Sequence, residues 1–169
     1  MNILVGYATA HGSTQEIAEH IGARLAEAGI TADVRPMDEV DSPDGYVAFV
    51  LGSAVHGQAW LPAAKDFVRR NSPLLCFRPV WLFSVGMPGA LRGPWKRLAP
   101  KEEPLIAQGL PGHLPYRNHR LLSGVVTRDH LPFKIRVIFR LMGCRYGDLR
   151  DWAAIDAWTD RIAADLCRV

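Results

Sequence analysis

Apolar residues along the chain follow two periods, one typical of buried strands and one typical of amphipathic helices. Short apolar runs recur, and the run at 46–51 has the uninterrupted character of a strand that is buried on both faces. Between these runs, apolar residues return every three or four positions, as at Ile17, Ile21 and Leu25. The patterns predict strands at about 2–7, 31–35, 46–51, 80–85 and 121–126, and helices at about 13–28, 61–71 and 152–167.

The alternation of strands and helices indicates an α/β fold with a buried parallel sheet. We predict a doubly wound, five-stranded sheet of order 2-1-3-4-5 in a single domain over residues 1–169, because this order places the loop after the first strand at the switch point. Six of the twelve prolines and five glycines lie between residues 86 and 119. This stretch has no clean period, and it predicts a long insertion after the fourth strand, at about 87–119.

The loop between the first strand and the first helix has the composition of an anion site. Backbone N–H groups at a helix N-terminus are free to bind an anion, and hydroxyl side chains add neutral donors. The loop lacks the lysine of a nucleotide-triphosphate loop and two of the three glycines of a dinucleotide fingerprint. A monophosphate held by hydrogen bonds fits it best, and an ordinary turn with a Ser or Thr cap is the alternative. Its residues are Thr9, Ala10, His11, Gly12, Ser13 and Thr14.

The T-x-x-G-x-T pattern of this loop resembles the phosphate loop of flavodoxin-like proteins, which holds the phosphate of FMN. The usual loop has a further Ser or Thr where this chain has His11, so we expect His11 to contribute its backbone N–H, and a direct contact of its imidazole with the phosphate is the alternative. The resemblance implies FMN as the cofactor and all six residues, 9–14, as cofactor-binding residues.

Two further loops are expected to meet the phosphate loop at the carboxyl ends of the strands. His56 is the candidate catalytic residue, because an imidazole near flavin N5 can donate a proton; a solvated loop histidine is the alternative. Trp60 is interpreted as a core anchor in preference to a stacking partner of the ring. Small residues in both loops allow the backbone to approach a flat ring, and the candidate contacts are Ser53, Ala54, Val55, His56, Gly57, Gly86 and Met87.

The formal net charge of +3 conceals an uneven distribution of charge. Residues 87–150 contain 12 Lys and Arg against 4 Asp and Glu, whereas the rest of the chain has 8 against 13. Such a basic region attracts anionic lipid, nucleic acid or an acidic small molecule. Within it, residues 131–142 predict a basic, apolar helix, with Asp129 as its cap and Pro132 in its first turn.

This helix is expected to cover the sheet with its apolar residues. The functional interpretation adds peripheral membrane contact, in which basic residues of the helix and of the insertion face lipid. These residues are Lys134, Arg136, Arg140, Arg145, Arg92, Lys96 and Arg97.

Nearly the whole chain is similar to the flavodoxin-like, menaquinone-dependent protoporphyrinogen dehydrogenases of bacteria. The similarity rests on the phosphate loop, the loop 52–57, the basic insertion, the run 122–126 with the basic helix after it, and the Trp-containing last helix. The resemblance implies FMN, a cytoplasmic location and contact with the membrane that holds the quinone. The stretch 143–148 and the proline content of the insertion depart from the family pattern, so the reduced substrate stays open between a porphyrinogen and another donor.

These observations predict an FMN-dependent oxidoreductase that passes electrons between a reduced small-molecule substrate and a quinone at the membrane surface. The alternative is a flavodoxin-like electron-transfer module that docks on a protein partner. A nucleic-acid-binding function is not expected, because the basic region has no known reading motif.

Other classes of protein are not expected either. Cys76, Cys144 and Cys167 form no C-x-x-C pair and are typical of reduced thiols in a cytoplasmic protein, so neither a metal site nor a disulfide is predicted. We expect no signal peptide, because the first apolar run lacks a basic leader, and we predict no membrane span, because no apolar window is long enough to cross a bilayer.

Overall fold

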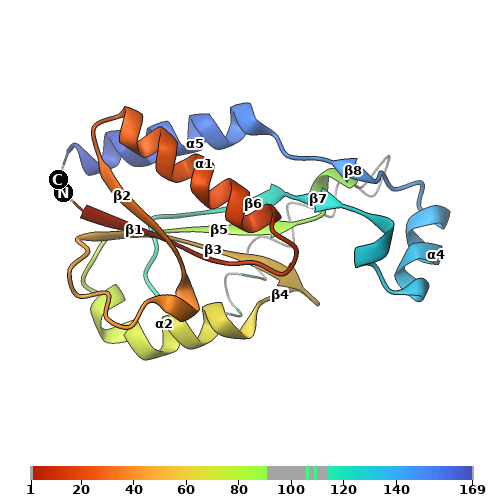
Figure 1. Ribbon diagram of the computed structural model, residues 1–169, viewed down its shortest axis with the longest axis horizontal. Coiled ribbons are helices and arrows are strands. Elements are labelled where there is room, and N and C mark those ends of the chain that lie inside the picture. Colours follow the sequence, from red (N-terminus) through yellow and green to blue (C-terminus); the bar gives the residue numbers. More distant parts are fainter. Residues whose placement is uncertain (1, 91–105, 107–108, 110–113, 169) are drawn as a thin grey trace.

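The computed structural model describes residues 2–90, 106, 109 and 114–168, and it has a central sheet with helices on both faces (Figure 1). The α-helices are α1 (Ser13–Glu27), α2 (Pro62–Leu75), α4 (Phe133–Leu141) and α5 (Trp152–Leu166). The strands are β1 (Asn2–Ala8), β2 (Thr31–Pro36), β3 (Ala48–His56), β4 (Ala59–Trp60), β5 (Val80–Gly86), β6 (Asn118–Ser123), β7 (Val125–Val126) and β8 (Gly147–Asp148). Short 3-10 helices are η1 (Met37–Glu39), η2 (Pro88–Ala90) and η4 (Arg128–His130).

The main sheet is parallel and has the order β2-β1-β3-β5-β6. In terms of the five predicted strands this is the order 2-1-3-4-5, so the predicted doubly wound, flavodoxin-like topology is confirmed. Helices α1 and α5 cover one face of the sheet and α2 covers the other (Figure 1). From β1 the chain goes first to β2 on one side and then to β3 on the other side, so the switch point of the sheet lies at β1.

The inner strands β1, β3 and β5 are buried on both faces, and their side chains alternate between two cores, whereas the edge strands β2 and β6 are partly exposed. Ile3 and Val5 pack in the core under α1 and α5, together with Trp158. Leu4 lies between them in sequence but packs in the opposite core, with Phe67 of α2. This alternation explains why the strand sequences are continuous apolar runs rather than half-polar ones.

Strand β3 extends beyond the predicted strand 46–51, because the small residues that follow Leu51 continue to pair with both neighbours. The chain reverses only at Gly57 and Gln58, whose φ angles of 57° and 62° form a two-residue hairpin turn. Strand β4 then pairs antiparallel with the end of β3. Small side chains are needed inside β3, since a Cβ at Gly52 would lie 1.9 Å from Cζ of Phe83.

The last predicted strand, 121–126, is divided in the structure. Its first part belongs to β6 in the main sheet, whereas β7 begins after Gly124 and pairs antiparallel with β8. A Cβ at Gly124 would lie 2.8 Å from Cγ1 of Val85 and 2.9 Å from Oγ of Ser13, so glycine allows the chain to pass close to α1 as it leaves the sheet. We call residues 125–148, which include η4 and α4, the arm.

Helix α4 in the arm does not cover the sheet, so that part of the prediction for residues 131–142 is wrong. The β7–β8 ribbon carries the helix beyond the end of the sheet (Figure 1). Pro132 occupies the N-cap position and no side chain caps the helix, so Asp129 is not its cap. Of the α4 side chains only Phe139 is buried, in a small cluster with Ala90 and Val126.

The predicted insertion, 87–119, follows β5, the fourth strand of the sheet, as expected, and its last two residues already belong to β6. Most of it is outside the described residues, and so are Arg92, Lys96 and Arg97. The described part includes η2 at its start, and Ile106 and Leu114 are buried in the core that α2 covers.

Candidate functional site

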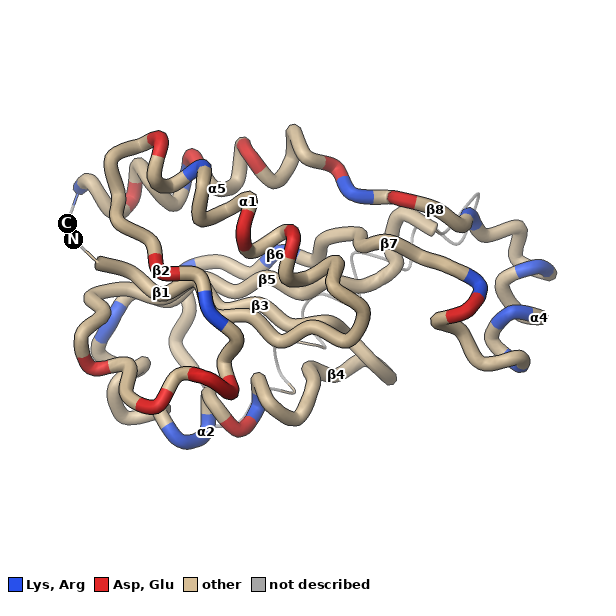
Figure 2. Tube along the Cα trace, viewed as in Figure 1, with Lys and Arg blue, Asp and Glu red and all other residues tan. Residues whose placement is uncertain are grey.

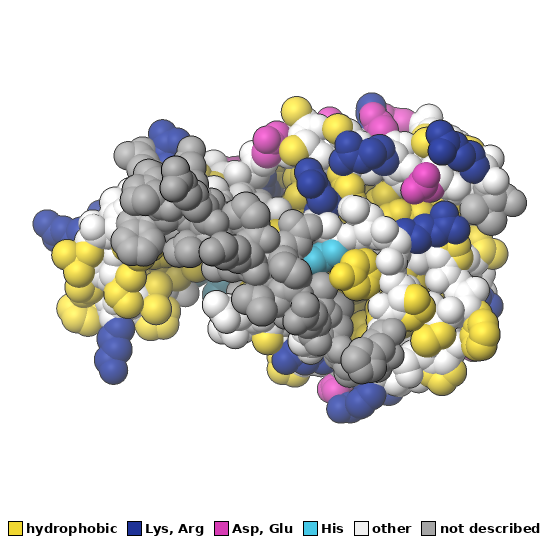
Figure 3. Space-filling view, turned by 180° about the vertical axis from the view of Figure 1, so that it is seen from behind, with side chains coloured by type: hydrophobic (Ala, Val, Ile, Leu, Met, Phe, Trp, Pro, Cys, Tyr) yellow, Lys and Arg dark blue, Asp and Glu magenta, His cyan; other side chains and the backbone are white. Residues whose placement is uncertain are grey.

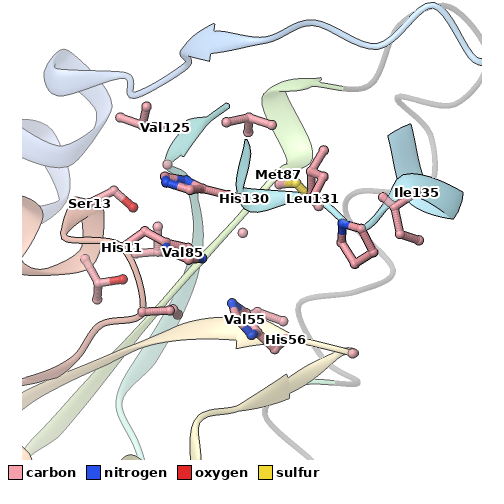
Figure 4. A pocket seen from close by; sticks show the side chains of 18 residues that line it. His11, Ser13, Val55, His56, Val85, Met87, Val125, His130, Leu131 and Ile135 are labelled. Carbon is pink, nitrogen blue, oxygen red and sulfur yellow. The ribbon is translucent and has the colours of Figure 1, made fainter. Parts of the chain in front are cut away.

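A cavity of about 360 Å³ opens where β1, β3 and β5 end, at the switch point of the sheet. Open α/β sheets bind their ligands at this edge. Its walls come from the loop after β1, the end of β3, the end of β5 and the start of the arm (Figure 4). The lining residues are Ala10, His11, Ser13, Thr14, Ala54, Val55, His56, Gly57, Val85, Gly86, Met87, Gly124, Val125, Val126, His130, Leu131, Pro132 and Ile135.

The loop after β1 forms one end of the cavity. Gly12 has a φ of 92°, a left-handed conformation that turns the chain directly into α1. Its N–H donates to Oγ1 of Thr9 over 2.9 Å, which fixes the loop from within. No side chain caps the N-terminus of α1, so the alternative of an ordinary capped turn is wrong. The N–H groups of the first helical turn therefore remain available to an anion.

Thr14 is the most informative residue of this loop. Its side chain is fully buried and lines the cavity, yet its Oγ1 has no hydrogen-bond partner within the described part of the chain. A buried hydroxyl without a partner costs about 1–3 kcal/mol, so folded proteins rarely retain one. An anion at the start of α1 would accept this hydrogen bond together with those of the backbone.

The end of β3 and the β3–β4 hairpin form the second wall. His56 is the last residue of β3, at the exposed mouth of the cavity. Ser53 lies below it and outside the lining, because its hydroxyl donates to the Ala54 carbonyl over 2.8 Å and accepts the Leu61 N–H over 3.0 Å. These bonds hold the strand and the following turn in place.

Trp60 is a core residue, as predicted, and does not line the cavity. Its side chain is buried, and its Nε1–H donates to Oγ of Ser84 over 2.7 Å. The same Oγ is 2.8 Å from Nε2 of His119. This buried network joins the hairpin to β5 and β6, so the hairpin that carries His56 has a rigid base.

The third wall combines the end of β5 with the start of the arm. The Gly124 N–H donates to the Gly86 carbonyl over 3.0 Å, and the Gly89 N–H donates to Oγ of Ser123 over 2.9 Å. These bonds hold the two segments side by side where the chain leaves the sheet. Apolar side chains then face the cavity, among them Val85, Met87, Val125, Leu131 and Ile135.

Three histidines come together across the cavity from three different elements (Figure 4). The rings of His11 and His130 are stacked, with centroids 3.8 Å apart and planes 6° from parallel. The ring of His56 lies 6.1 Å from that of His11. The pKa of His11 is below its ordinary value of 6.5, first because its surroundings desolvate the ring and then because of positive charge on His130 and His56.

The structure brings most of the predicted site residues to this cavity. Thr9, Gly12 and Ser53 are the exceptions, since they do not line it but hold the loops that do. Sequence reasoning missed Val85 and the whole contribution of residues 124–135, including His130. The signal for it was Gly124, a glycine within an apolar run, which marks a position where the chain leaves the strand geometry.

The cavity fits a ligand with a flat apolar ring and an anionic tail. Hydroxyl and amide donors gather at the α1 end, and apolar side chains form the walls beyond. No Lys or Arg is found among the lining residues that the structure describes, so in this part of the wall neutral donors and imidazoles would hold the anion. Among the described residues, no group of His, Cys, Asp and Glu is arranged to hold a metal ion.

A family model described as a flavodoxin domain matches residues 4–148. This range includes the phosphate loop, every lining residue of the cavity and the whole arm.

Among curated proteins, the chain is similar to protoporphyrinogen IX dehydrogenase (quinone) of Escherichia coli K12. The two are 30% identical over 99 residues, which cover 57% of this chain and 54% of that protein. The chain thus spans about half the length of the curated relatives it matches.

Among solved structures, the chain resembles the rubredoxin oxygen:oxidoreductase of Desulfovibrio gigas, with a TM-score of 0.61 and 13% identity over 99% of this chain and 36% of that one. It also resembles a flavodoxin of Streptococcus pneumoniae TIGR4, with a TM-score of 0.60 and 13% identity over 98% of this chain and 99% of that one. At this level of identity the two likenesses show the shared fold alone.

Proposed function

Because the chain belongs to the flavodoxin domain family, we propose that it is an FMN-dependent oxidoreductase that passes electrons from a reduced substrate to a quinone at a membrane surface. FMN is the cofactor of this family, and electron transfer is its general function. The finer assignment draws on the similarity to protoporphyrinogen IX dehydrogenase (quinone) and on the exposed face of the arm. The single observation that supports the cofactor site is the buried hydroxyl of Thr14 at the cavity end of α1, which has no hydrogen-bond partner among the residues that the structure describes.

The phosphate-loop residues 9–14 would hold the FMN phosphate. The Thr14 hydroxyl and the N–H groups at the start of α1 donate hydrogen bonds to it, and Gly12 gives the loop the shape that this requires. The apolar walls, with residues 54–57, Gly86 and Met87, would exclude water from the flavin ring. When bound, FMN supplies the capacity to accept and release electrons at its ring.

His56 is proposed as the residue that holds a proton at the mouth of the cavity. An exposed imidazole at the end of β3 can exchange protons with solvent and remain within the cavity wall. Each turnover takes two electrons and two protons from the reduced substrate and delivers them to a quinone, which becomes a quinol. An imidazole nitrogen of His56 would accept and donate protons during this transfer.

The reduced substrate is proposed to be a porphyrinogen, as the name of the E. coli relative indicates for that protein. A porphyrinogen carries carboxylates, which basic side chains bind. Exposed candidates in the arm are Lys134, Arg136, Arg140 and Arg145. Figure 2 shows Lys and Arg residues along α4 and most Asp and Glu residues along the rest of the chain.

The membrane-facing surface is proposed to be α4, on the cytoplasmic side of the cell membrane. Phe133 and Leu141 are 77% and 81% exposed, and Ile135, Val137 and Ile138 are exposed as well. Apolar side chains gather at this end of the molecule with Lys and Arg around them (Figure 3). A basic, apolar helix of this kind binds in the plane of an anionic bilayer surface. None of the described helices is long and apolar enough to cross a bilayer.

The position of the cavity supports quinone as the acceptor. Leu131, Pro132 and Ile135 line the cavity and belong to the same segment as α4. Binding of α4 to lipid would therefore place the cavity next to the bilayer in which a quinone dissolves.

An anaerobic assay tests the proposed reaction. The FMN-loaded protein is mixed with protoporphyrinogen and a menaquinone analogue, and porphyrin fluorescence and quinol are followed together. We expect repeated turnover that forms both products, and His56→Gln should slow it without loss of bound FMN. His20→Gln is the matched control, because His20 pairs with Asp156 on the outer surface of α1 and α5. A protein that holds FMN but produces neither porphyrin nor quinol would contradict the enzyme assignment.

The alternative is a flavodoxin-like electron-transfer module that docks on a protein partner. The likeness to the S. pneumoniae flavodoxin over nearly the whole of both chains favours it. In that case the FMN-loaded protein would exchange electrons stoichiometrically with a redox protein and would show no catalytic turnover of quinone.

A further inference from the structure

We propose that His11 and His130 together form a proton-linked site for the FMN phosphate, so that the arm supplies a cofactor-binding residue. The inference rests on FMN as the cofactor and goes beyond the loop of residues 9–14 that the sequence predicts. It does not depend on the electron donor or acceptor.

The geometry places both imidazoles beside the N-terminus of α1. His11 belongs to the phosphate loop and His130 is the last residue of η4, yet their rings stack with 3.8 Å between centroids. Figure 4 shows this pair next to Ser13, on the side of the cavity where α1 begins. Both side chains are exposed to the cavity, so neither needs to leave a packed core to meet a ligand.

The charge of the ligand gives these rings a role. A phosphate monoester carries a charge near −2 at neutral pH, and its second pKa is about 6. Among the described residues that line the cavity there is no Lys or Arg, and the titratable side chains are His11, His56 and His130. Imidazoles are therefore the groups of the described cavity wall that can bring positive charge to the phosphate.

Other charged groups near the pair are engaged elsewhere or flank it. Glu16, in the first turn of α1, is paired with Arg150, which also pairs with Asp148. In η4, Arg128 lies over the ring of Tyr146, 5.3 Å from its centroid, and Asp129 is exposed beside His130. His56, 6.1 Å from His11, adds a third imidazole from the opposite wall.

The sign of the proton linkage follows from this arrangement. In the free protein, desolvation and then the two neighbouring histidines hold the pKa of His11 below its ordinary value. A bound dianion favours the protonated imidazole, so the pKa of His11 is higher in the complex than in the free protein. Binding above neutral pH therefore takes up a proton, and FMN affinity falls as the pH rises through the raised pKa of His11.

Titration with two flavins tests the inference. FMN and riboflavin share the ring but only FMN has the phosphate, and their affinities for the flavin-free protein are measured at about pH 6.5 and about pH 8.5. We expect FMN affinity to fall about tenfold across this interval and riboflavin affinity to stay unchanged, as for a lost charge-assisted hydrogen bond. Calorimetry in two buffers of different ionisation enthalpy should show proton uptake at the higher pH with FMN alone.

Variants of the two histidines give the decisive comparison. His130→Gln and His11→Gln should each weaken FMN about tenfold at about pH 6.5 and flatten its pH dependence. His20→Gln is the matched control and should leave both unchanged. An unaltered pH profile in His130→Gln, with FMN still bound, would overturn this inference and leave the cofactor assignment intact. A wild-type protein that binds neither flavin would overturn both.

Discussion

Large apolar side chains are buried in the sheet core but exposed in the arm. Phe83 in β5 is fully buried against Trp158 and the backbone of β3, whereas Phe133 in α4 is 77% exposed. The two regions meet at Gly124, where the chain leaves the sheet. An apolar residue in the core stabilises the fold, while an apolar residue in the arm is free to contact something outside the chain. The cavity lies at the junction and takes residues from both regions.

The largest expected effect comes from truncating the same residue type in each region. Phe83→Ala removes a fully buried ring and should lower the free energy of unfolding by about 3–5 kcal/mol. Phe133→Ala should change it by less than about 0.5 kcal/mol, since little of that ring is buried. Urea unfolding of the two variants measures the contrast, and equal losses would show that the arm is part of the folded core.

The proposed membrane face can be tested without disturbing the core. Replacing both Phe133 and Leu141 by Ser should weaken binding to anionic vesicles by about 2 kcal/mol, or about thirtyfold, because two exposed apolar side chains are lost. Vesicle sedimentation gives the partition constant. The matched control is Phe77→Ser, which removes a side chain 90% exposed after α2, outside the arm. If both proteins lose binding equally, α4 is not the lipid-facing element.

Thr14 stands where the core meets the cavity, and one substitution should separate stability from cofactor binding. Thr14→Val replaces a buried hydroxyl, which has no partner in the described part of the chain, by a methyl group of similar size. The flavin-free protein should become about 1 kcal/mol more stable, while FMN affinity falls about tenfold. Thermal unfolding and flavin titration of the same sample measure both quantities. A loss of stability with unchanged FMN affinity would assign the hydroxyl to the fold.

The smallest expected effect concerns the ion pairs that link the arm to α1. Arg150 bonds to Asp148 of β8 over 2.6 Å and also pairs with Glu16 of α1. Hydrogen bonding from Arg150 holds the pKa of Asp148 below its ordinary value, so this contribution to stability is present at neutral pH and is lost as the pH falls through the lowered pKa. Asp148→Asn should lower the melting temperature slightly at pH 7 and not below that pKa. A difference that persists in strong acid would point to packing instead of charge.

The core was predictable from the sequence, because each strand and helix there buries a periodic set of side chains. The order of the sheet followed from that alternation and from the phosphate loop at its switch point. Trp60 was correctly interpreted as a core anchor. The extent of β3 was not predicted. Its last residues are small and have the composition of a loop, but they pair with β5, and the chain turns only at Gly57 and Gln58.

The arm was predicted only as a helix, and its position was wrong. The local sequence gives the helical periodicity of residues 133–141, but it does not show what the apolar face of the helix contacts. The pairing of β7 with β8 joins residues more than 20 positions apart in the sequence. The stacking of His130 on His11 is a long-range contact of the same kind. Such contacts depend on the direction that the β7–β8 ribbon gives to the arm, so no short sequence motif predicts them.

The central claim is that the cavity at the start of α1 holds FMN through its phosphate. Titration of the purified flavin-free protein with FMN, followed by quenching of flavin fluorescence, tests this directly. We expect saturable one-to-one binding at micromolar concentrations or below, with riboflavin bound more weakly. A protein that leaves FMN fluorescence unchanged at these concentrations, or that binds riboflavin as tightly as FMN, would contradict the account.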